Sequence, residues 1–406
     1  MARLVGIQLC ELDLPFRRAF RHAAASRAQS SSLFVRFLTD DGQCGYGEAL
    51  PRSYVTGEER GAAFDLLAER ILPRLLGMSF ASFEEVLAFL IRCDGQPPAG
   101  WVEAGTPHTA AWCAVDLALL DVFGRSFGTR LADGVPSAMG GPSPARAWPA
   151  DLRYSLVLSG EGGAHAFTSL LKARLYGLRD VKVKVDRASS TGVRLARCVL
   201  GRRARIRVDS NMAWSYAGAG PAMSVLAREG VESFEQPLPA GDLDGMARLC
   251  AETGLAVIAD ESVHDAASLE RAIAAHACTG VNVRIAKCGG LVAALTRCRR
   301  ALEAGLTLQV GCLVGETSQL SAAQLVLVRT LGRGILHLEG CFGERLLLSD
   351  PVWPRLQFGW GGLPPEAPSG SGFGTSVDMD LLARHSGRWA SFGVPIPTNS
   401  EGEARP

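Results

Sequence analysis

Apolar residues recur with two different periods along this chain, and the period changes with position. Over roughly the first 60 residues they alternate with polar ones, which predicts β-strands at 5–9, 32–37 and 44–48. A helical period follows at 58–93 and at 110–123, and Gly124 is expected to end the second helical stretch. These elements predict an α+β module in the first part of the chain.

Beyond a Pro-, Gly- and Ser-rich stretch at 135–149, β-branched runs alternate with helix-like runs. Eight strands are expected, at 154–159, 181–185, 205–209, 231–235, 256–260, 281–287, 306–311 and 335–339. Eight is the number of strands that closes a β/α barrel. We therefore expect an α/β protein with an α+β module at 1–140, a barrel at 141–345 and a C-terminal segment, 346–406, that packs back on the first module.

Charge and cysteine usage narrow the classes of partner. The 406 residues include 42 Lys and Arg against 41 Asp and Glu, a net charge of +1, and like charges form no long run. A nucleic-acid partner is therefore not expected, and a small molecule is favoured. Eleven scattered cysteines without a Cys-x-x-Cys spacing indicate reduced thiols in a cytoplasm. Neither export nor membrane insertion is expected, and homo-oligomerisation is left open.

Charged residues close nearly every predicted strand of the barrel. They recur at intervals of roughly 25–29 residues, the length of one strand plus one helix: Lys184, Asp209, Glu235, Asp260, Lys287 and Glu316. The C-terminal ends of parallel strands meet at one mouth of a β/α barrel, where enzymes of this architecture place their chemistry. The spacing therefore predicts a metal-dependent barrel enzyme.

The three acidic residues in the middle of this series predict a metal site. Asp209, Glu235 and Asp260 close consecutive strands, so their carboxylates are expected side by side, and three gathered negative charges need a cation. Oxygen ligands without His or Cys select a hard ion, for which Mg²⁺ fits best and Mn²⁺ can substitute. A single acidic residue at a strand end is more often solvated or a helix cap.

The lysines predict acid/base chemistry. Lys182 and Lys184 share a face of their strand, and Lys287 closes a strand on the opposite side of the barrel. A desolvated lysine near other cations can act as a base near neutral pH. Lys184 and Lys287 are thus expected to face each other across a substrate, with Lys182 either beside them or serving as an ion-pair partner.

Five further polar residues are expected near the mouth. Asn211 and Glu261 directly follow the acidic strand ends and would orient ligands or a lysine. Glu316 would hydrogen-bond the substrate, and His337 and Glu339, which share a face of the eighth strand, would contact its distal part. A purely structural role is an equal alternative for Asn211, Glu261 and Glu316.

The strand-end motifs resemble the enolase superfamily, and within it the muconate lactonizing enzyme subgroup. The motifs are Lys182-Val-Lys184, Asp209-Ser-Asn211, Glu235-Gln-Pro237, Asp260-Glu-Ser262 and Lys287-Cys-Gly-Gly290, with 114–121 and 372–378 as further landmarks. The resemblance implies a modified TIM barrel under an α+β capping domain built from both ends of the chain. It also implies Mg²⁺ on Asp209, Glu235 and Asp260, and removal of the proton α to a carboxylate with Lys184 and Lys287 as acid/base pair and Lys182 as electrostatic helper.

The resemblance predicts the half-reaction better than the product. Members of the subgroup epimerise dipeptides or N-acyl amino acids, cycloisomerise muconate, or dehydrate to succinylbenzoate. Dipeptide epimerases of the subgroup usually carry Asp-x-Asp in the eighth strand, where this chain has His337-Leu-Glu339. Epimerisation of a dipeptide or amino-acid derivative is favoured. A cycloisomerase or dehydratase, and a non-catalytic barrel that binds a carboxylate, are the alternatives.

Overall fold

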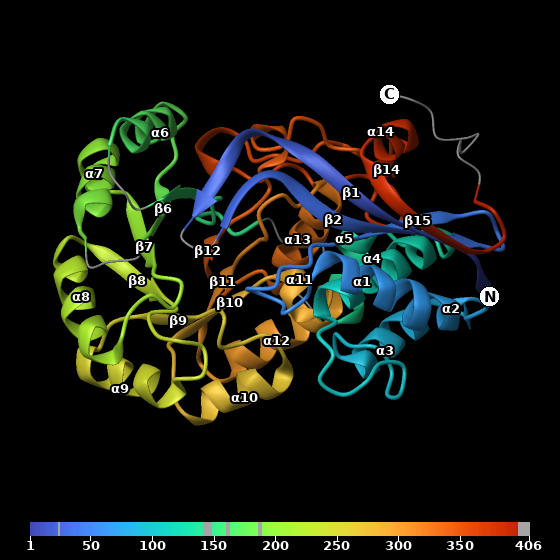
Figure 1. Cartoon of the computed structure of the whole chain (residues 1–406), viewed down its shortest axis with the longest axis horizontal. Coiled ribbons are helices and arrows are strands. Elements are labelled where there is room, and N and C mark those ends of the chain that lie inside the picture. The colour runs from blue at the N-terminus through green and yellow to red at the C-terminus, as the bar shows by residue number, and fades with distance from the viewer. Residues whose placement is uncertain (23–24, 141–147, 160–162, 186–188, 397–406) are drawn as a thin grey trace.

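The first strands of the chain form an antiparallel sheet that the last strand completes. The computed structural model describes residues 1–22, 25–140, 148–159, 163–185 and 189–396. In this sheet β15 (Ser386–Gly393), β1 (Ala2–His22), β2 (Ala25–Thr39) and β3 (Cys44–Ala49) are neighbours in that order, and β4 (Ser79–Phe80) pairs with the start of β1. The antiparallel pairing of β1 with β15 places the first and last strands of the chain side by side (Figure 1). The C-terminal segment thus packs on the first module, as predicted.

The helices of this module pack on one face of the sheet. They are α1 (Arg60–Leu66), a π-helical turn (Leu67–Ile71), α2 (Leu72–Leu75), α3 (Phe83–Cys93), α4 (Thr109–Ser126) and α5 (Leu131–Ala138). The central helix, α4, is buried along nearly its whole length because it lies between the sheet and the rest of the protein. It runs through Gly124, so the predicted helix end was wrong by a few residues. The predicted linker begins inside α5, and residues 141–147 lie outside the described part of the chain.

Eight parallel strands form the barrel, as predicted. They are β5 (Leu156–Ser159), β6 (Asp180–Lys184), β7 (Arg205–Asp209), β8 (Val231–Glu235), β9 (Val257–Ala259), β10 (Gly280–Val283), β11 (Thr307–Val310) and β12 (Ile335–Leu338). Each strand pairs with the next in sequence order. The sheet closes where the amide of Ser155, just before β5, donates to the carbonyl of Leu338 at 2.9 Å.

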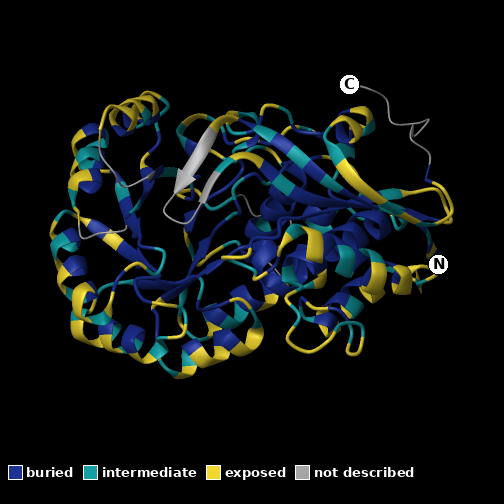
Figure 2. Cartoon of the chain, in the orientation of Figure 1, coloured by how far each residue is buried: buried dark blue, intermediate teal, exposed yellow. Residues whose placement is uncertain are grey.

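Helices cover the outside of the barrel. They are α6 (Ala164–Leu175), α7 (Thr191–Leu200), α8 (Tyr216–Arg228), α9 (Leu243–Thr253), α10 (Ala266–Ala274), α11 (Ile285–Cys288), α12 (Leu291–Glu303) and α13 (Ser318–Leu331). Figure 2 shows that α6 to α10 turn their exposed residues outward and their buried residues toward the strands. This is the pattern of an amphipathic helix that packs on a barrel. By contrast, α13 is almost entirely buried.

The sixth strand is shorter than predicted. It ends at Val283, and the next residues turn into α11, which stops at Gly289 with φ 84°. Lys287 therefore lies in a helical turn rather than at the end of a strand. This difference moves its side chain away from the position expected for a second base.

Two glycines let the barrel approach α4 and the loop after α3. A Cβ on Gly289 would lie 1.9 Å from the carbonyl oxygen of Gly95, and one on Gly290 would lie 2.2 Å from Cγ of Asp116 in α4. The space is used by a hydrogen bond, since the Leu291 amide donates to Oδ1 of Asp116 at 2.7 Å. The two glycines of the Lys287–Gly290 motif thus allow the barrel to pack closely against the first module.

Candidate active site

Three buried carboxylates stand at the ends of neighbouring strands. Asp209 ends β7 and is in register with Glu235, which ends β8. Asp260 follows β9 directly, and all three residues are at most 1% exposed. The structure therefore brings the predicted acidic residues to one mouth of the barrel, where their charges need compensation.

Lys182 supplies part of that compensation. Its Nζ lies 2.9 Å from Oδ2 of Asp209, 2.9 Å from Oε1 of Glu235 and 3.2 Å from Oε1 of Glu339. Burial alone would lower the pKa of Lys182, but these three carboxylates outweigh it and raise the pKa well above its ordinary value. Lys182 thus stays an ammonium, which fits the predicted helper and ion-pair roles and not that of a base.

Arg284 neutralises the other side of the cluster. The residue directly follows β10, and its guanidinium contacts Oδ2 of Asp260 and lies 3.7 Å from Oε1 of Glu235. Burial raises the pKa of Glu235, but Lys182 and Arg284 overcome it and hold the pKa well below the ordinary value. Glu235 is consequently a carboxylate at every physiological pH.

Lys287 occupies a different place from the one predicted. Its Nζ donates to the carbonyl oxygen of Asp260 at 2.8 Å, to Oδ1 of the same residue at 2.7 Å and to the carbonyl oxygen of Asn282 at 2.8 Å. The side chain is 1% exposed. Because α11 turns it back toward the main chain, Lys287 holds the Asp260 loop and does not face Lys184 across the site.

Lys184 is placed as the sequence predicts. Its side chain is 21% exposed, its Nζ donates to Oδ1 of Asn211 at 3.0 Å, and Oδ2 of Asp209 lies 3.7 Å away. Asn211 in turn donates through Nδ2 to Oε1 of Glu261 at 3.3 Å. Burial and the neighbouring Asp260 raise the pKa of Glu261 to about 7. Asn211 and Glu261 therefore hold the lysine from the outer side of the site.

Glu339 and His337 lie at different depths below the mouth of the barrel. Glu339 lies beside Lys182, accepts from Nη2 of Arg207 at 2.6 Å and from Nε2 of Gln309 at 3.2 Å. Burial raises its pKa, but Lys182 and Arg207 outweigh burial and lower it. His337 is 2% exposed, 3.8 Å from Asp180 at the start of β6, and burial together with Arg207 lowers its pKa to about 4. His337 thus lies in the interior, one layer below the mouth, and not where a substrate contact was expected.

Glu316 also lies away from the other acidic groups. Its Oε1 accepts from the amide of Leu313 at 2.7 Å, and burial raises its pKa to about 8. It belongs to a narrow space beside Gly340 and Cys341 rather than to the cavity that Lys184 lines. The expected hydrogen bond from Glu316 to a substrate has no support in this arrangement.

The barrel and the elements that follow it match a known family. The family model described as Enolase C-terminal domain-like matches residues 167–381, more than half of the chain. The chain belongs to the enolase superfamily. This agrees with the strand-end motifs and with the capping module built from both chain ends.

Relatives and solved structures support the muconate lactonizing enzyme subgroup. The L-Ala-D/L-Glu epimerase of Clostridium acetobutylicum is 26% identical over 331 residues, which cover 80% of this chain and 87% of the relative. The muconate lactonizing enzyme of Pseudomonas fluorescens, complexed with muconolactone, superposes with a TM-score of 0.80 at 25% identity, covering 94% of this chain and 99% of that one. A dipeptide epimerase from Cytophaga hutchinsonii, complexed with Mg and D-Ala-L-Val, gives 0.81 at 20% identity, with 96% and 99% covered.

The carboxylate oxygens of Asp209, Glu235 and Asp260 are the kind of ligand that a hard cation prefers. The three carboxylates share cations, and Oδ2 of Asp209 is buried without a hydrogen bond. Within the described ranges, however, no three acidic, His or Cys side chains converge closely enough to form a ligand group. The positive charge near Glu235 comes from Lys182 and Arg284, and that near Asp260 comes from Arg284 and Lys287.

A cavity of about 360 Å³ opens over this cluster. Its charged lining comprises four cationic side chains and two acidic ones: Lys182, Lys184, Arg284, Arg345, Glu261 and Glu339. Tyr54 and Val55 of the capping module cover it. Because Lys182 and Arg284 are paired with Asp209, Glu235 and Asp260, it is the further positive charge of Lys184 and Arg345 in the lining that favours an anionic ligand.

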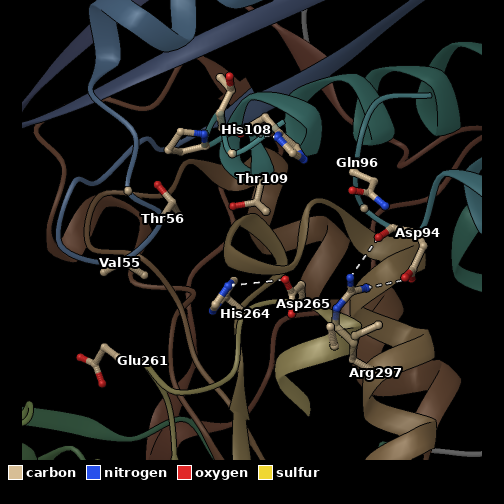
Figure 3. A pocket seen from close by; sticks show the side chains of 17 residues that line it. Val55, Thr56, Asp94, Gln96, His108, Thr109, Glu261, His264, Asp265 and Arg297 are labelled. Atoms are coloured by element: carbon tan, nitrogen blue, oxygen red, sulfur yellow. Dashed lines mark hydrogen bonds and ion pairs between the residues drawn. The ribbon is translucent and has the colours of Figure 1, made fainter. Parts of the chain in front are cut away.

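A second cavity of about 730 Å³ adjoins the first, with which it shares Val55 and Glu261. Figure 3 shows His108 and Thr109 on one side and His264 on the other, with Arg297 bound to Asp94 and His264 bound to Asp265. It lies where the capping module meets the barrel. The site is therefore open toward this junction.

Sequence reasoning missed three residues of the site. Asn282 and Gln309 donate to the two oxygens of Glu235 at 2.8 and 2.7 Å, and Arg284 contacts Asp260. The sequence signal that could have identified them is a polar residue in an otherwise apolar strand, at a position whose side chain points into the barrel. Asn282 and Arg284 share one face of the sixth strand, whereas Lys287 has the opposite parity.

Proposed function

We propose that this chain is an isomerase that removes the proton α to the carboxylate of a small molecule, with Lys184 as the base. The observation that carries the proposal is the position of Lys184. Its Nζ lines the cavity, hydrogen-bonds Asn211 and stands beside a set of buried carboxylates. Lys182 also lines the cavity, but its ammonium is paired with three carboxylates. Lys287 is enclosed by its acceptors, so among the described lysines of the barrel strands and their loops Lys184 is the one left to act as a base on a substrate in the cavity.

The proton transfer breaks the α C–H bond. The proton passes to Nζ of Lys184, and the electron pair moves into the carboxylate to form an enolate. The cationic lining of the cavity stabilises the charge that develops on the carboxylate oxygens. Asp209, Glu235 and Asp260 would hold Mg²⁺, or Mn²⁺ in its place, and the ion would add positive charge at the same oxygens.

Enolate formation can lead to two kinds of overall reaction. Epimerisation of a dipeptide or amino-acid derivative is supported by the name of the Clostridium acetobutylicum relative. Cycloisomerisation or dehydration is the second candidate. It is supported by Arg284, because a guanidinium rather than an amine lines the cavity across from Lys184. Glu339 is already bound to Lys182 and Arg207, so it offers less to a substrate ammonium than the sequence predicted.

A reducing compartment such as the cytoplasm is proposed from the cysteines. They form no disulfide within the described part of the chain. No helix in the described part of the chain is long and apolar enough to cross a membrane.

Proton exchange tests the proposed step directly. The protein is incubated in D₂O with Mg²⁺ and a panel of dipeptides and N-acyl amino acids, and α-deuterium is measured by mass spectrometry. We expect exchange with at least one compound and its loss in Lys184→Met. Lys172→Met, which removes an exposed lysine on α6, is the matched control and should exchange normally. Absence of exchange in the whole panel would favour a non-catalytic carboxylate-binding barrel.

A further inference from the structure

Lys184 and Arg284 face each other across the barrel. β6 and β10 are separated by three strands on either side of the closed sheet, so they are diametrically opposed. Lys184 is the last residue of β6, and Arg284 is the first after β10. Both line the 360 Å³ cavity. A substrate in this cavity therefore has an amine on one face and a guanidinium on the other.

Lys287 does not provide a second amine. An ammonium has three donors, and the acceptors within reach of its Nζ are three oxygen atoms that belong to Asp260 and Asn282. Its side chain is 1% exposed and is absent from the cavity lining. To reach the substrate it would have to give up all three hydrogen bonds and break its buried ion pair with Asp260, which is costly.

The two facing groups differ in what they can do to a proton. A lysine amine can accept one, whereas a guanidinium keeps its charge and offers only hydrogen-bond donors. Arg284 is further held by Asp260 and Glu235. We propose that Arg284 makes proton transfer one-sided, so that the α-proton leaves and returns only on the face of the substrate next to Lys184. This inference rests on the proposed role of Lys184, and of the candidate reactions it selects cycloisomerisation or dehydration, because epimerisation needs a proton donor on the opposite face.

Proton transfer takes place on the Lys184 face of the substrate. There the C–H bond breaks, the proton goes to Nζ and the pair of electrons forms the enolate. The lysine, which is partly exposed, exchanges its protons with solvent and returns one to the same face, so the C–H bond reforms with retention. On the Arg284 face no group accepts the proton, and the guanidinium stabilises the enolate charge instead.

Stereochemical exchange in D₂O tests this inference. The probes are L-Ala-L-Glu, L-Ala-D-Glu and both enantiomers of N-acetylglutamate, with the intact protein and Mg²⁺. We expect deuterium to enter one member of a pair about 100-fold faster than the other, with retention, since a positioned base contributes at least this factor. Arg284→Lys should reduce the ratio toward one and produce interconversion of the two members.

Two further variants make the result decisive. Arg300→Lys changes an arginine on the outside of α12 that pairs with Glu270, and it should keep the wild-type ratio. Lys287→Met should slow both members alike and keep the ratio. Equal exchange of both members by the wild type, or selective loss of the slower one in Lys287→Met, would overturn the inference. Exchange of neither member would instead remove the proposed role of Lys184, and the inference with it.

Discussion

The ammonium nitrogen of Lys182 lies 2.9 Å from Oε1 of Glu235, inside the barrel and away from solvent. A buried ion pair of this kind contributes little by comparison with an apolar pair, but breaking it leaves an uncompensated charge. The charges at the mouth of this barrel are therefore interdependent.

Replacing Lys182 with Met should destabilise the protein. Asp209, Glu235 and Glu339 would lose their shared cation, which should lower the free energy of unfolding by about 3–5 kcal/mol. Urea denaturation followed by circular dichroism measures the change. The double variant Lys182→Met/Glu339→Gln should recover part of the loss. Unchanged stability of the single variant would contradict a structural role for this ammonium.

Glu235→Gln should weaken Mg²⁺ binding. The substitution removes one negative charge from the proposed donor set while the amide keeps the shape of the side chain. Isothermal titration calorimetry of Mg²⁺ into the apo protein gives the affinity. Glu232→Gln is the matched control, because Glu232 lies on the same strand but is exposed and pairs with Arg205. Equal affinities for the two variants would argue against a metal site at Glu235.

Asn211→Gly should slow proton exchange by about 10–100-fold through loss of the partner that orients Lys184. Asn211 has φ 44°, a conformation that glycine adopts without strain, so the fold should be retained. Asn211→Asp keeps the acceptor oxygen and should lose less. The effect is expected in kcat rather than in KM, measured as the initial rate of α-deuterium incorporation. A change confined to KM would assign Asn211 to substrate binding instead.

Gly290→Ala should destabilise the contact between the capping module and the barrel. A Cβ at this position would lie 2.2 Å from Cγ of Asp116, and the backbone has φ 124°. The combined steric and backbone cost is about 2–4 kcal/mol, to be measured by urea denaturation. Gly61→Ala is the control. Its Cβ meets nothing within 4 Å, and in an exposed helix alanine should stabilise by about 0.5–1 kcal/mol.

Asp116→Asn should reduce the pH dependence of stability. Burial raises the pKa of Asp116 from 3.8 to about 7 in the folded protein. The native state therefore holds this proton over a range where the unfolded chain has lost it, and stability falls as pH rises from about 4 through 7. Asparagine cannot ionise but can still accept from Leu291. Unfolding free energies at pH 5 and pH 8 should converge by about 1–4 kcal/mol in the variant. An unaltered difference would show that Asp116 ionises normally.

The local pattern of apolar and charged residues was sufficient to predict the barrel and most of the acidic cluster at its mouth. Strands of alternating or continuous apolar residues closed by charged ones place Asp209, Glu235 and Asp260 at one mouth, whatever the details of packing. Lys184 follows from the same pattern. The packing of the C-terminal segment on the first module was also predictable in outline, from the resemblance to the enolase superfamily.

The sequence pattern could not predict how deep in the barrel a side chain lies or which way it points. His337 and Glu339 share a face, yet a rise of two residues moves one below the mouth and leaves the other beside Lys182. Glu316 closes its run as the other charged residues do, but its carboxylate turns to the amide of Leu313. These positions depend on which neighbours fill the barrel at each level.

Strand and helix periods and strand-end positions are local properties of the chain, so the pattern of amino acids alone predicts a β/α barrel whose charged residues gather at one end. Which cation faces Lys184 depends instead on packing between distant parts of the chain. The run from Val281 to Lys287 reads as one strand, but the close approach of Gly289 and Gly290 to the capping module turns it into a helix after Val283. Arg284 is thereby left on the cavity wall and Lys287 bound to Asp260.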